Sequence, residues 1–325
     1  MRFALNFRWA FSTDPEGSRR VRMRALARVE SSATLCHLPG WYGGGISQTG
    51  VRERVQSCRG CRELYKLVPA KDPTRTKVYG SCALVGNSGV MLVAKQGAAI
   101  DAHDMVFRFN GAPTKGLEEY VGSRTDFRLV NSKWTESREA ASETVLWNMR
   151  AASALEFYTE RKRKSPDERF SIFTADFVNY VGQTAAQLSA SFKGTPQAAA
   201  FEAMEGPQSG YTPTSGFTGL LMAINVCAKV TMYGMQLSEA QGFSYHYHNQ
   251  CPQPYSARDD AEFLLFNRIV QMGLASFHEP CIVECKGERA QCDACRAAHP
   301  ELFAPALMAR ADAVLKTTPL PVRSP

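Results

Sequence analysis

Two short loops in this sequence carry residue types that can bind an anion. The first, residues 86–89, places Asn87 and Ser88 between two glycines. The second precedes an apolar helical pattern and brings hydroxyls and backbone N–H groups to a helix start, where negative charge is favoured. Its residues are Pro213, Thr214, Ser215 and Gly216. Both loops also have a structural interpretation, because Asn and Ser are ordinary turn residues and either hydroxyl of the second loop could simply cap the helix.

Proton transfer must come from few side chains, because the chain has only six histidines: His37, His103, His246, His248, His278 and His299. His246 and His248 lie in a polar segment, and imidazole is the side chain best suited to move a proton near neutral pH. Asp259 and Asp260 begin a predicted helix and could act as a base if their surroundings raise the pKa of a carboxyl group. The alternatives are a surface histidine in a polar loop and two carboxylates that complement the helix dipole.

The ten cysteines allow several kinds of site. Two pairs have the Cys-x-x-Cys spacing of structural zinc, redox pairs or plain disulfides: Cys58 with Cys61, and Cys292 with Cys295. Zinc would require both pairs to meet across the whole domain, so we favour disulfides and an oxidising compartment. We expect a local disulfide knot among four cysteines: Cys281, Cys285, Cys292 and Cys295. Since no Asp-x-Asp motif occurs either, we expect no metal and no other cofactor.

The charge of the chain argues against nucleic acid as a partner. The net charge is +7, and much of it comes from an Arg-rich stretch, residues 19–28, and from the run Arg161–Lys164. Such runs are usually solvated, and this run lacks interleaved aromatic residues before Ser165 and Pro166 end it. A dinucleotide site is also disfavoured, because residues 86–89 do not fit Gly-x-Gly-x-x-Gly. The chain also lacks the phosphate-binding motif Gly-x-x-x-x-Gly-Lys, and this absence disfavours a nucleotide triphosphatase.

Short β-prone segments alternate with helical or loop segments along the middle of the chain. The expected strands are residues 78–85, 105–108, 127–130, 144–147, 170–173, 229–233 and 276–283. The clearest helices are residues 218–227 and 261–274, where apolar residues recur at every third or fourth position. This alternation predicts an α/β fold: a single domain with a mostly parallel central sheet flanked by helices. Ligands bind such sheets at the carboxyl ends of the strands, where both anion-binding loops fall.

Longer segments around these loops resemble the eukaryotic sialyltransferase family, and they occur in the family's order. Four segments are similar to its large sialylmotif: residues 82–89, 100–104, 107–114 and 121–125. Three segments resemble its small sialylmotif: residues 213–216, 226–227 and 233–235. His246-Tyr247-His248-Asn249 looks like its third motif.

The resemblance implies a reaction. It implies the sialyltransferase-type variant of the nucleotide-sugar glycosyltransferase fold, and transfer of sialic acid or a related acidic keto-sugar from a CMP-sugar to a glycan hydroxyl of a glycoprotein or glycolipid. The transfer would be inverting and independent of metal. The chemistry agrees, because a CMP leaving group carries a single phosphate that hydrogen bonds and a histidine can stabilise without a divalent cation.

The resemblance also implies roles for individual residues. The family joins the cysteines of its large and small motifs, so Cys82 and Cys227 should form a disulfide. Asn87 and Asn110 are expected at the nucleotide, and further hydrogen-bond donors are expected from Ser88, Thr214, Ser215 and Gly216. His246 would be the general acid or the partner of the donor phosphate. His103 is expected to be buried beside the site, and His278 to be structural.

The family's very small motif is where this sequence departs. The family has a histidine five residues before a glutamate, and that histidine takes the proton from the acceptor hydroxyl. Here the glutamate is Glu262, and the histidine position holds Ala257, or Arg258 if a gap of one residue is allowed. Three explanations stay open: another base among Asp259, Asp260 and His248, loss of turnover, or a different alignment. Loss of turnover makes a CMP-sugar- or glycan-binding protein the alternative function.

Composition divides the chain into three parts. Residues 1–75 form an Arg- and Gly-rich arm or stem, expected to be partly disordered; residues 76–285 form the catalytic domain; and residues 286–325 form a cysteine-containing extension. No stretch has the roughly 18 apolar residues that span a bilayer, and no signal-peptide pattern is present. Three relations to a membrane stay open: the chain is soluble, it has an anchor upstream of Met1, or its arm contains a targeting segment. The resemblance implies the Golgi lumen.

Overall fold

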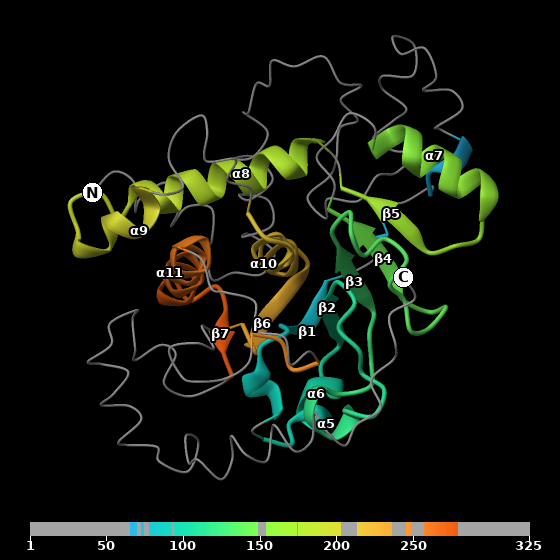
Figure 1. Cartoon of the computed structure of the whole chain (residues 1–325), viewed down its shortest axis with the longest axis horizontal. Helices are drawn as coiled ribbons and strands as arrows, with labels where there is room; N and C mark the ends of the chain where they lie inside the picture. The colour runs from blue at the N-terminus through green and yellow to red at the C-terminus, as the bar shows by residue number, and fades with distance from the viewer. Residues whose placement is uncertain are drawn as a thin grey trace.

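A parallel sheet of seven strands organises the part of the chain that the structure describes (Figure 1). This structure, a computed structural model, describes residues 66–69, 73–74, 78–92, 94–148, 154–173, 175–202, 213–235, 245–248 and 257–278. The strands are β1 (Tyr79–Val85), β2 (Met105–Phe109), β3 (Phe127–Val130), β4 (Thr144–Trp147), β5 (Phe170–Ile172), β6 (Cys227–Tyr233) and β7 (Ser276–Phe277). All neighbouring strands are parallel. The predicted α/β fold is confirmed, and each strand lies within two residues of its predicted start.

Helices cover both faces of this sheet (Figure 1). One face packs against α8 (Ala175–Ala190), α9 (Ala199–Glu202), α10 (Ser215–Val226) and α11 (Ala257–Gln271), with η2 (Pro196–Ala198) between α8 and α9. The other packs against η1 (Gly89–Leu92), α5 (Gly97–Asp101), α6 (Glu118–Val121) and α7 (Ala154–Lys164). Successive strand residues alternate between these two cores, as Leu84 and Val85 do. The predicted sheet flanked by helices is therefore a three-layer domain.

Two helices differ at their ends from the sequence expectation, for local reasons. α10 begins three residues early because Thr214 caps it: the Thr214 hydroxyl accepts a hydrogen bond of 3.2 Å from the Phe217 N–H. α11 ends at Gln271 because Gly273 adopts a left-handed conformation with φ of 73°, which glycine tolerates and which stops a helix. Apolar periodicity detects the packed face of a helix, but it does not detect a capping hydrogen bond or a left-handed glycine.

The order of the strands defines where a ligand can bind. That order is β5-β4-β3-β2-β1-β6-β7, so the chain runs outward from β1 to β5 and then returns to the opposite side of β1. The side on which the chain adds new strands therefore reverses between β1 and β6, while the two strands remain parallel. In open parallel sheets the crevice for a ligand forms at this reversal, at the carboxyl ends of the strands.

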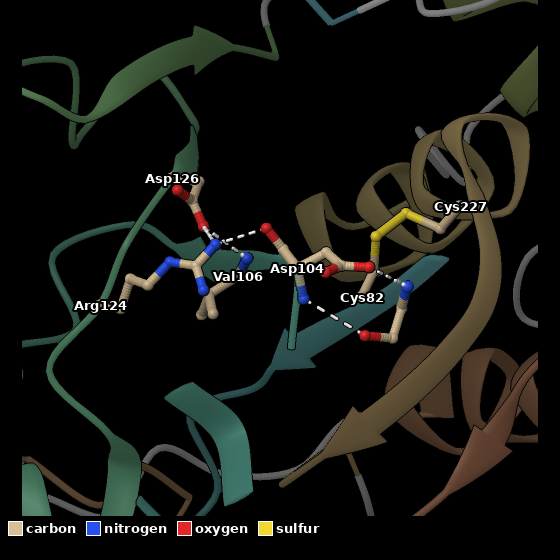
Figure 2. The surroundings of a disulfide bond; sticks show 7 residues. Cys82, Asp104, Val106, Arg124, Asp126 and Cys227 are labelled. Carbon is tan, nitrogen blue, oxygen red and sulfur yellow. Dashed lines mark hydrogen bonds and ion pairs between the residues drawn. A yellow bond between two sulfur atoms is a disulfide. The ribbon is translucent and has the colours of Figure 1, made fainter. Parts of the chain in front are cut away.

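A disulfide lies on the α10 side of the sheet, and Figure 2 shows its surroundings. Cys82 in the middle of β1 is bonded to Cys227, the first residue of β6, with the two Cα atoms 6.1 Å apart. The implied Cys82–Cys227 pairing is confirmed, although Cys82 lies inside its strand and not at the strand's end. The neighbouring polar groups are also paired: the Asp104 carboxylate accepts a bond of 2.9 Å from the Ser81 N–H, and Arg124 forms an ion pair of 2.9 Å with Asp126.

Removing this disulfide should lower the free energy of unfolding substantially. The bond closes a sequence separation of 145 residues, and the chain-entropy account gives about 4–5 kcal/mol as an upper figure for so long a loop. Chemical denaturation of a Cys82→Ala/Cys227→Ala double variant should show a loss of about 2–5 kcal/mol. Peptide mapping without reductant should recover the two cysteines as one cross-linked peptide. Finding both thiols alkylated without reductant would contradict the pairing.

Several sequence predictions fall on residues outside the described ranges. They include most of the arm at residues 1–75, the whole extension at residues 286–325, and both Cys-x-x-Cys pairs with the expected C-terminal disulfide knot. These stay predictions. None of the helices in the described ranges has both the length and the apolar character of a membrane-spanning segment.

Candidate functional site

Asparagines follow four adjacent strands at the carboxyl edge of the sheet. Asn87, Asn110, Asn131 and Asn148 come one or two residues after β1, β2, β3 and β4, which are neighbours in the sheet. Because neighbouring strands lie about 4.8 Å apart, this row of amides extends over roughly 15 Å. Sequence reasoning predicted Asn87 and Asn110 and missed Asn131 and Asn148. The asparagine repeated after each of these four strands was the signal that could have found them.

The loop after β1 sits directly against the end of β6. The Gly86 N–H donates a bond of 2.7 Å to the Tyr233 carbonyl, and a Cβ on Gly86 would lie 2.3 Å from the Gly234 carbonyl oxygen. Only glycine fits there. Within the described residues, the buried side-chain oxygen of Asn87 accepts no hydrogen bond, so it can accept one from a ligand. Ser88 is buried, and its hydroxyl accepts a bond of 3.3 Å from the Val90 N–H, as its turn interpretation predicts.

The loop after β2 begins at a residue with unusual backbone geometry. Asn110 has φ of 51°, in the left-handed region that asparagine tolerates better than most residues with a Cβ. Its side-chain oxygen accepts a bond of 3.1 Å from the Asn131 N–H, and its own N–H donates to the Leu129 carbonyl at 2.8 Å. These bonds orient the Asn110 side chain across the edge of the sheet, so its amide N–H groups are the part available to a ligand.

The start of α10 lies at the same edge. A Cβ on Gly216 would lie 2.9 Å from the Met235 methyl group, and a Cβ on Gly86 would lie 2.6 Å from the Met235 sulfur. Met235 therefore lies between the first turn of α10 and the loop after β1. Ser215 is buried in that first turn. The two candidate anion-binding loops, residues 86–89 and 213–216, are far apart in the sequence and yet belong to one region of the fold.

Thr214 is committed to contacts within the protein. Besides capping α10, its hydroxyl and its N–H each donate a bond of 2.5 Å to the carboxylate of Glu262, which is only 3% exposed. The capping alternative is confirmed for Thr214, and any contact with a ligand stays a prediction. The same pair ties the first half of α11 to the start of α10. Asp259 and Asp260 lie in the first turn of α11, and the structure describes their backbone only.

The segment with the two predicted histidines is held in place by the tyrosine between them. Tyr247 is fully buried; its N–H donates to the Asn87 carbonyl and its hydroxyl to the Pro113 carbonyl, both at 2.7 Å. Burial raises the pKa of the Tyr247 phenol to about 12, so the hydroxyl remains a hydrogen-bond donor at neutral pH. The rings of His246 and His248 stack with their centroids 4.9 Å apart. Sequence reasoning missed Tyr247, which brings both imidazoles to the loop after β1.

His103, expected to be buried beside the site, and His278, expected to be structural, both contact Tyr233 at the end of β6. The Nε2 atom of His103 is 3.0 Å from the Tyr233 hydroxyl, and the ring of His278 stacks on Tyr233 at 4.5 Å. Burial lowers the pKa of both imidazoles, which favours their neutral forms. His103 is half-buried and not fully buried as expected. Within the described ranges, neither histidine forms a hydrogen bond to any of the four asparagines.

The structure thus separates the predicted residues into two places. Those from strand-end loops gather at the carboxyl edge: Asn87, Ser88, Asn110, Thr214, Ser215, Gly216, His246 and His248. The bridge between Cys82 and Cys227 lies farther back along the strands. The edge offers neutral amides, a helix start and imidazoles, which together suit a ligand that carries a phosphate and hydroxyl groups.

Comparison with known proteins identifies the class of this site. The sequence matches Glycosyltransferase family 29 (sialyltransferase) over residues 41–273. The chain belongs to this family, and the resemblance seen in its motifs is confirmed.

Individual members of the family have low sequence identity to this chain. Beta-galactoside alpha-2,6-sialyltransferase 2 of Bos taurus is 27% identical over 260 residues, which cover 73% of this chain and 48% of the relative. CMP-N-acetylneuraminate-beta-galactosamide-alpha-2,3-sialyltransferase 1 of Gallus gallus is 29% identical over 204 residues, 57% of this chain and 54% of the relative. The chain therefore spans about half the length of the curated relatives it matches.

Among solved structures, a mammalian sialyltransferase in complex with Gal-beta-1-3GalNAc-ortho-nitrophenol has a similar fold. The TM-score is 0.52 with 19% sequence identity, and the match covers 85% of this chain and 95% of that chain. At this identity the likeness shows the fold alone. The expected sialyltransferase-type variant of the glycosyltransferase fold is confirmed.

Proposed function

We propose that this protein is a sialyltransferase that transfers sialic acid from CMP-sialic acid to a hydroxyl group of a glycan. Membership of the family supports the class of reaction. The names of relatives specify an alpha-2,6-sialyltransferase for a beta-galactoside and an alpha-2,3-sialyltransferase for a beta-galactosamide, which supports the sugar and the kind of acceptor. The observation that carries the proposal is the buried side-chain oxygen of Asn87, which has no hydrogen-bond partner among the described residues and lies at the edge where the start of α10 and the His246 segment meet. The family supports the Golgi lumen as the compartment.

The proposed mechanism is inverting and uses no metal. The donor phosphate lies within reach of backbone N–H groups of the first turn of α10 and of the amides of Asn87 and Asn110. His246 donates a hydrogen bond or a proton to the phosphate as CMP departs. Preorganised donors of this kind stabilise developing negative charge, and one phosphate needs fewer of them than a pyrophosphate. A base on the opposite side of the sugar accepts the proton of the glycan hydroxyl.

A second candidate is a protein that binds a CMP-sugar or a glycan without turnover. The observation that favours it is Ala257 at the first position of α11, where the family has its general base. Two measurements separate the candidates. Calorimetry with CMP reports binding, and transfer of radiolabelled sialic acid from CMP-sialic acid to Gal-beta-1-3GalNAc and to galactosides reports turnover. CMP binding together with transfer supports the enzyme. CMP binding without transfer to any acceptor supports the binding protein. The absence of CMP binding contradicts both candidates.

Variants of the two asparagines should weaken the binding of CMP. Asn87→Ala and Asn110→Ala should each cost roughly 1–3 kcal/mol, or about 5- to 150-fold in affinity, because a polar partner of the ligand is left unmatched. Asn110→Gly is the matched control for backbone strain, since glycine adopts the observed φ of 51° without cost. If the amide itself binds the nucleotide, calorimetry should find Asn110→Gly as weak as Asn110→Ala. Wild-type affinity in all three variants would place the nucleotide elsewhere.

A further inference from the structure

A buried guanidinium supports the loop that carries Asn110. Arg128 is the second residue of β3, and its side chain is 1% exposed. Its Nη1 atom donates to the carbonyl of Asn110 at 3.0 Å and to the carbonyl of Ala112 at 2.9 Å. Both acceptors belong to the loop that follows the neighbouring strand β2. The Arg128 side chain on β3 therefore bonds to the main chain of the candidate binding loop after β2.

Two glutamates between β3 and β4 hold this guanidinium in place. Glu143 accepts bonds from Nε at 2.6 Å and from Nη2 at 3.2 Å, and Glu139 accepts from Nη2 at 2.9 Å. Burial alone would lower the pKa of the Arg128 guanidinium, but the hydrogen bond and charge of Glu143 and the charge of Glu139 outweigh burial and raise it. Arg128 is thus a permanent cation whose planar group has one orientation.

The same network reaches the far end of the loop. The Glu139 carboxylate also accepts a bond of 2.8 Å from the Thr114 N–H and one of 3.2 Å from its hydroxyl. Pro113 between these points accepts the Tyr247 hydroxyl. Residues 110–114 are therefore bonded at their beginning, middle and end to groups from three different parts of the chain.

The beginning of this loop is the place that most needs support. A positive φ is uncommon for a residue with a Cβ, even for asparagine, so surrounding contacts must hold Asn110 in it. The carbon of the Asn110 carbonyl that Arg128 binds is one of the four atoms that define this φ. A buried ion network is weak evidence for stability, because well-packed apolar residues are often as stable. Its directional bonds do fix the geometry of the groups they touch.

We propose that Arg128 is a positioning residue of the donor site, which with Glu139 and Glu143 holds Asn110 so that its amide faces the nucleotide. This inference rests on the proposed function. We expect no contact between Arg128 and the ligand, because its side chain is 1% exposed and its Nη1 atom bonds to the carbonyls of the loop. Its effect is on the geometry of donor binding and not on the acceptor.

The test compares donor and acceptor parameters in variants of the network. Arg128→Met and Arg128→Lys should weaken CMP binding roughly 10- to 100-fold and raise the KM for CMP-sialic acid, since misplacing a binding group by about 1 Å can cost that much. The KM for the glycan acceptor should stay within about twofold. Glu139→Gln, at a half-buried position, should keep the fold and show a smaller loss of the same kind. Arg161→Met is the matched control: Arg161, on α7, forms a partly buried ion pair of 2.6 Å with Glu168, outside the loop network.

Each outcome decides the inference. A selective loss of CMP affinity in the Arg128 and Glu139 variants, with none in Arg161→Met at temperatures where all are folded, supports positioning. Equal changes in donor and acceptor parameters, or wild-type CMP affinity in folded variants, overturn it and leave the proposed function standing. If Arg128→Met does not fold, Glu139→Gln and Arg128→Lys decide the question. A wild-type chain that binds no CMP overturns the proposed function and this inference with it.

Discussion

Replacing His246 by alanine should lower the rate of sialic acid transfer by roughly 10²–10⁴-fold, the usual contribution of a general acid or base. The physical reason is the placement of the imidazole. The buried Tyr247 ties this segment to the Asn87 carbonyl and to the loop after β2, so His246 is fixed beside the loop proposed to hold the phosphate. A leaving phosphate that loses its proton donor departs as a less stabilised dianion, and kcat falls for that reason.

The His246→Ala measurement needs a readout that separates phosphate contact from damage to the fold. Calorimetry with CMP and with cytidine supplies it, because only CMP carries the charge that the imidazole would face. The variant should bind CMP more weakly and cytidine as the wild type does. His278→Ala is the matched control, since His278 lies directly after β7 and stacks on Tyr233. A His246→Ala variant with unchanged kcat would show that another group assists the phosphate.

The sheet could be predicted because its strands are buried on both faces. Runs such as Cys82 to Val85 then consist of apolar residues and end abruptly at glycine and asparagine, which marks both the strand and the loop at its carboxyl end. The same pattern places Asn87 and Asn110 in loops at the ends of strands, whereas their contact with a nucleotide stays a prediction. The helix ends were less predictable, because Thr214 and Gly273 act through a hydrogen bond and a backbone angle that apolar periodicity does not register.

The supporting contacts of the site could not be predicted, because they join residues that are far apart in the sequence. The hydroxyl of Tyr247 reaches Pro113 across 134 residues, and Glu262 reaches Thr214 across 48. Arg128 did leave a signal: a charged residue inside an apolar strand of a sheet covered on both faces must be buried and must have partners. The sequence nevertheless does not say which carboxylates those partners are.

The contact between Glu262 and Thr214 gives the missing general base a location. Glu262 binds the residue that caps α10, so this turn of α11 lies against the start of α10. Position 257 is five residues earlier in the same helix, about 7–8 Å along its axis at 1.5 Å per residue. The backbone of α11 therefore places Ala257, Asp259 and Asp260 within about a turn and a half of the contact between Glu262 and Thr214, and their part in proton transfer stays a prediction.

Restoring the family's histidine should raise the rate of transfer, because attack by a glycan hydroxyl requires a proton acceptor that departure of the phosphate does not supply. Ala257→His should increase kcat by up to roughly 10²-fold if the wild-type chain uses a poorly placed base, with CMP affinity unchanged. Asp259→Asn, Asp260→Asn and His248→Gln are nearly isosteric variants that remove one proton acceptor each, and the variant that abolishes transfer identifies the working base. A carboxylate base should also shift the acidic limb of the pH–rate profile below that of the Ala257→His variant, because the pKa of a carboxyl group starts lower than that of imidazole. If Ala257→His gains nothing while one aspartate variant is inactive, the aspartate has replaced the histidine. If wild type and every variant bind CMP but transfer no sugar, the chain is a binding protein on the sialyltransferase fold.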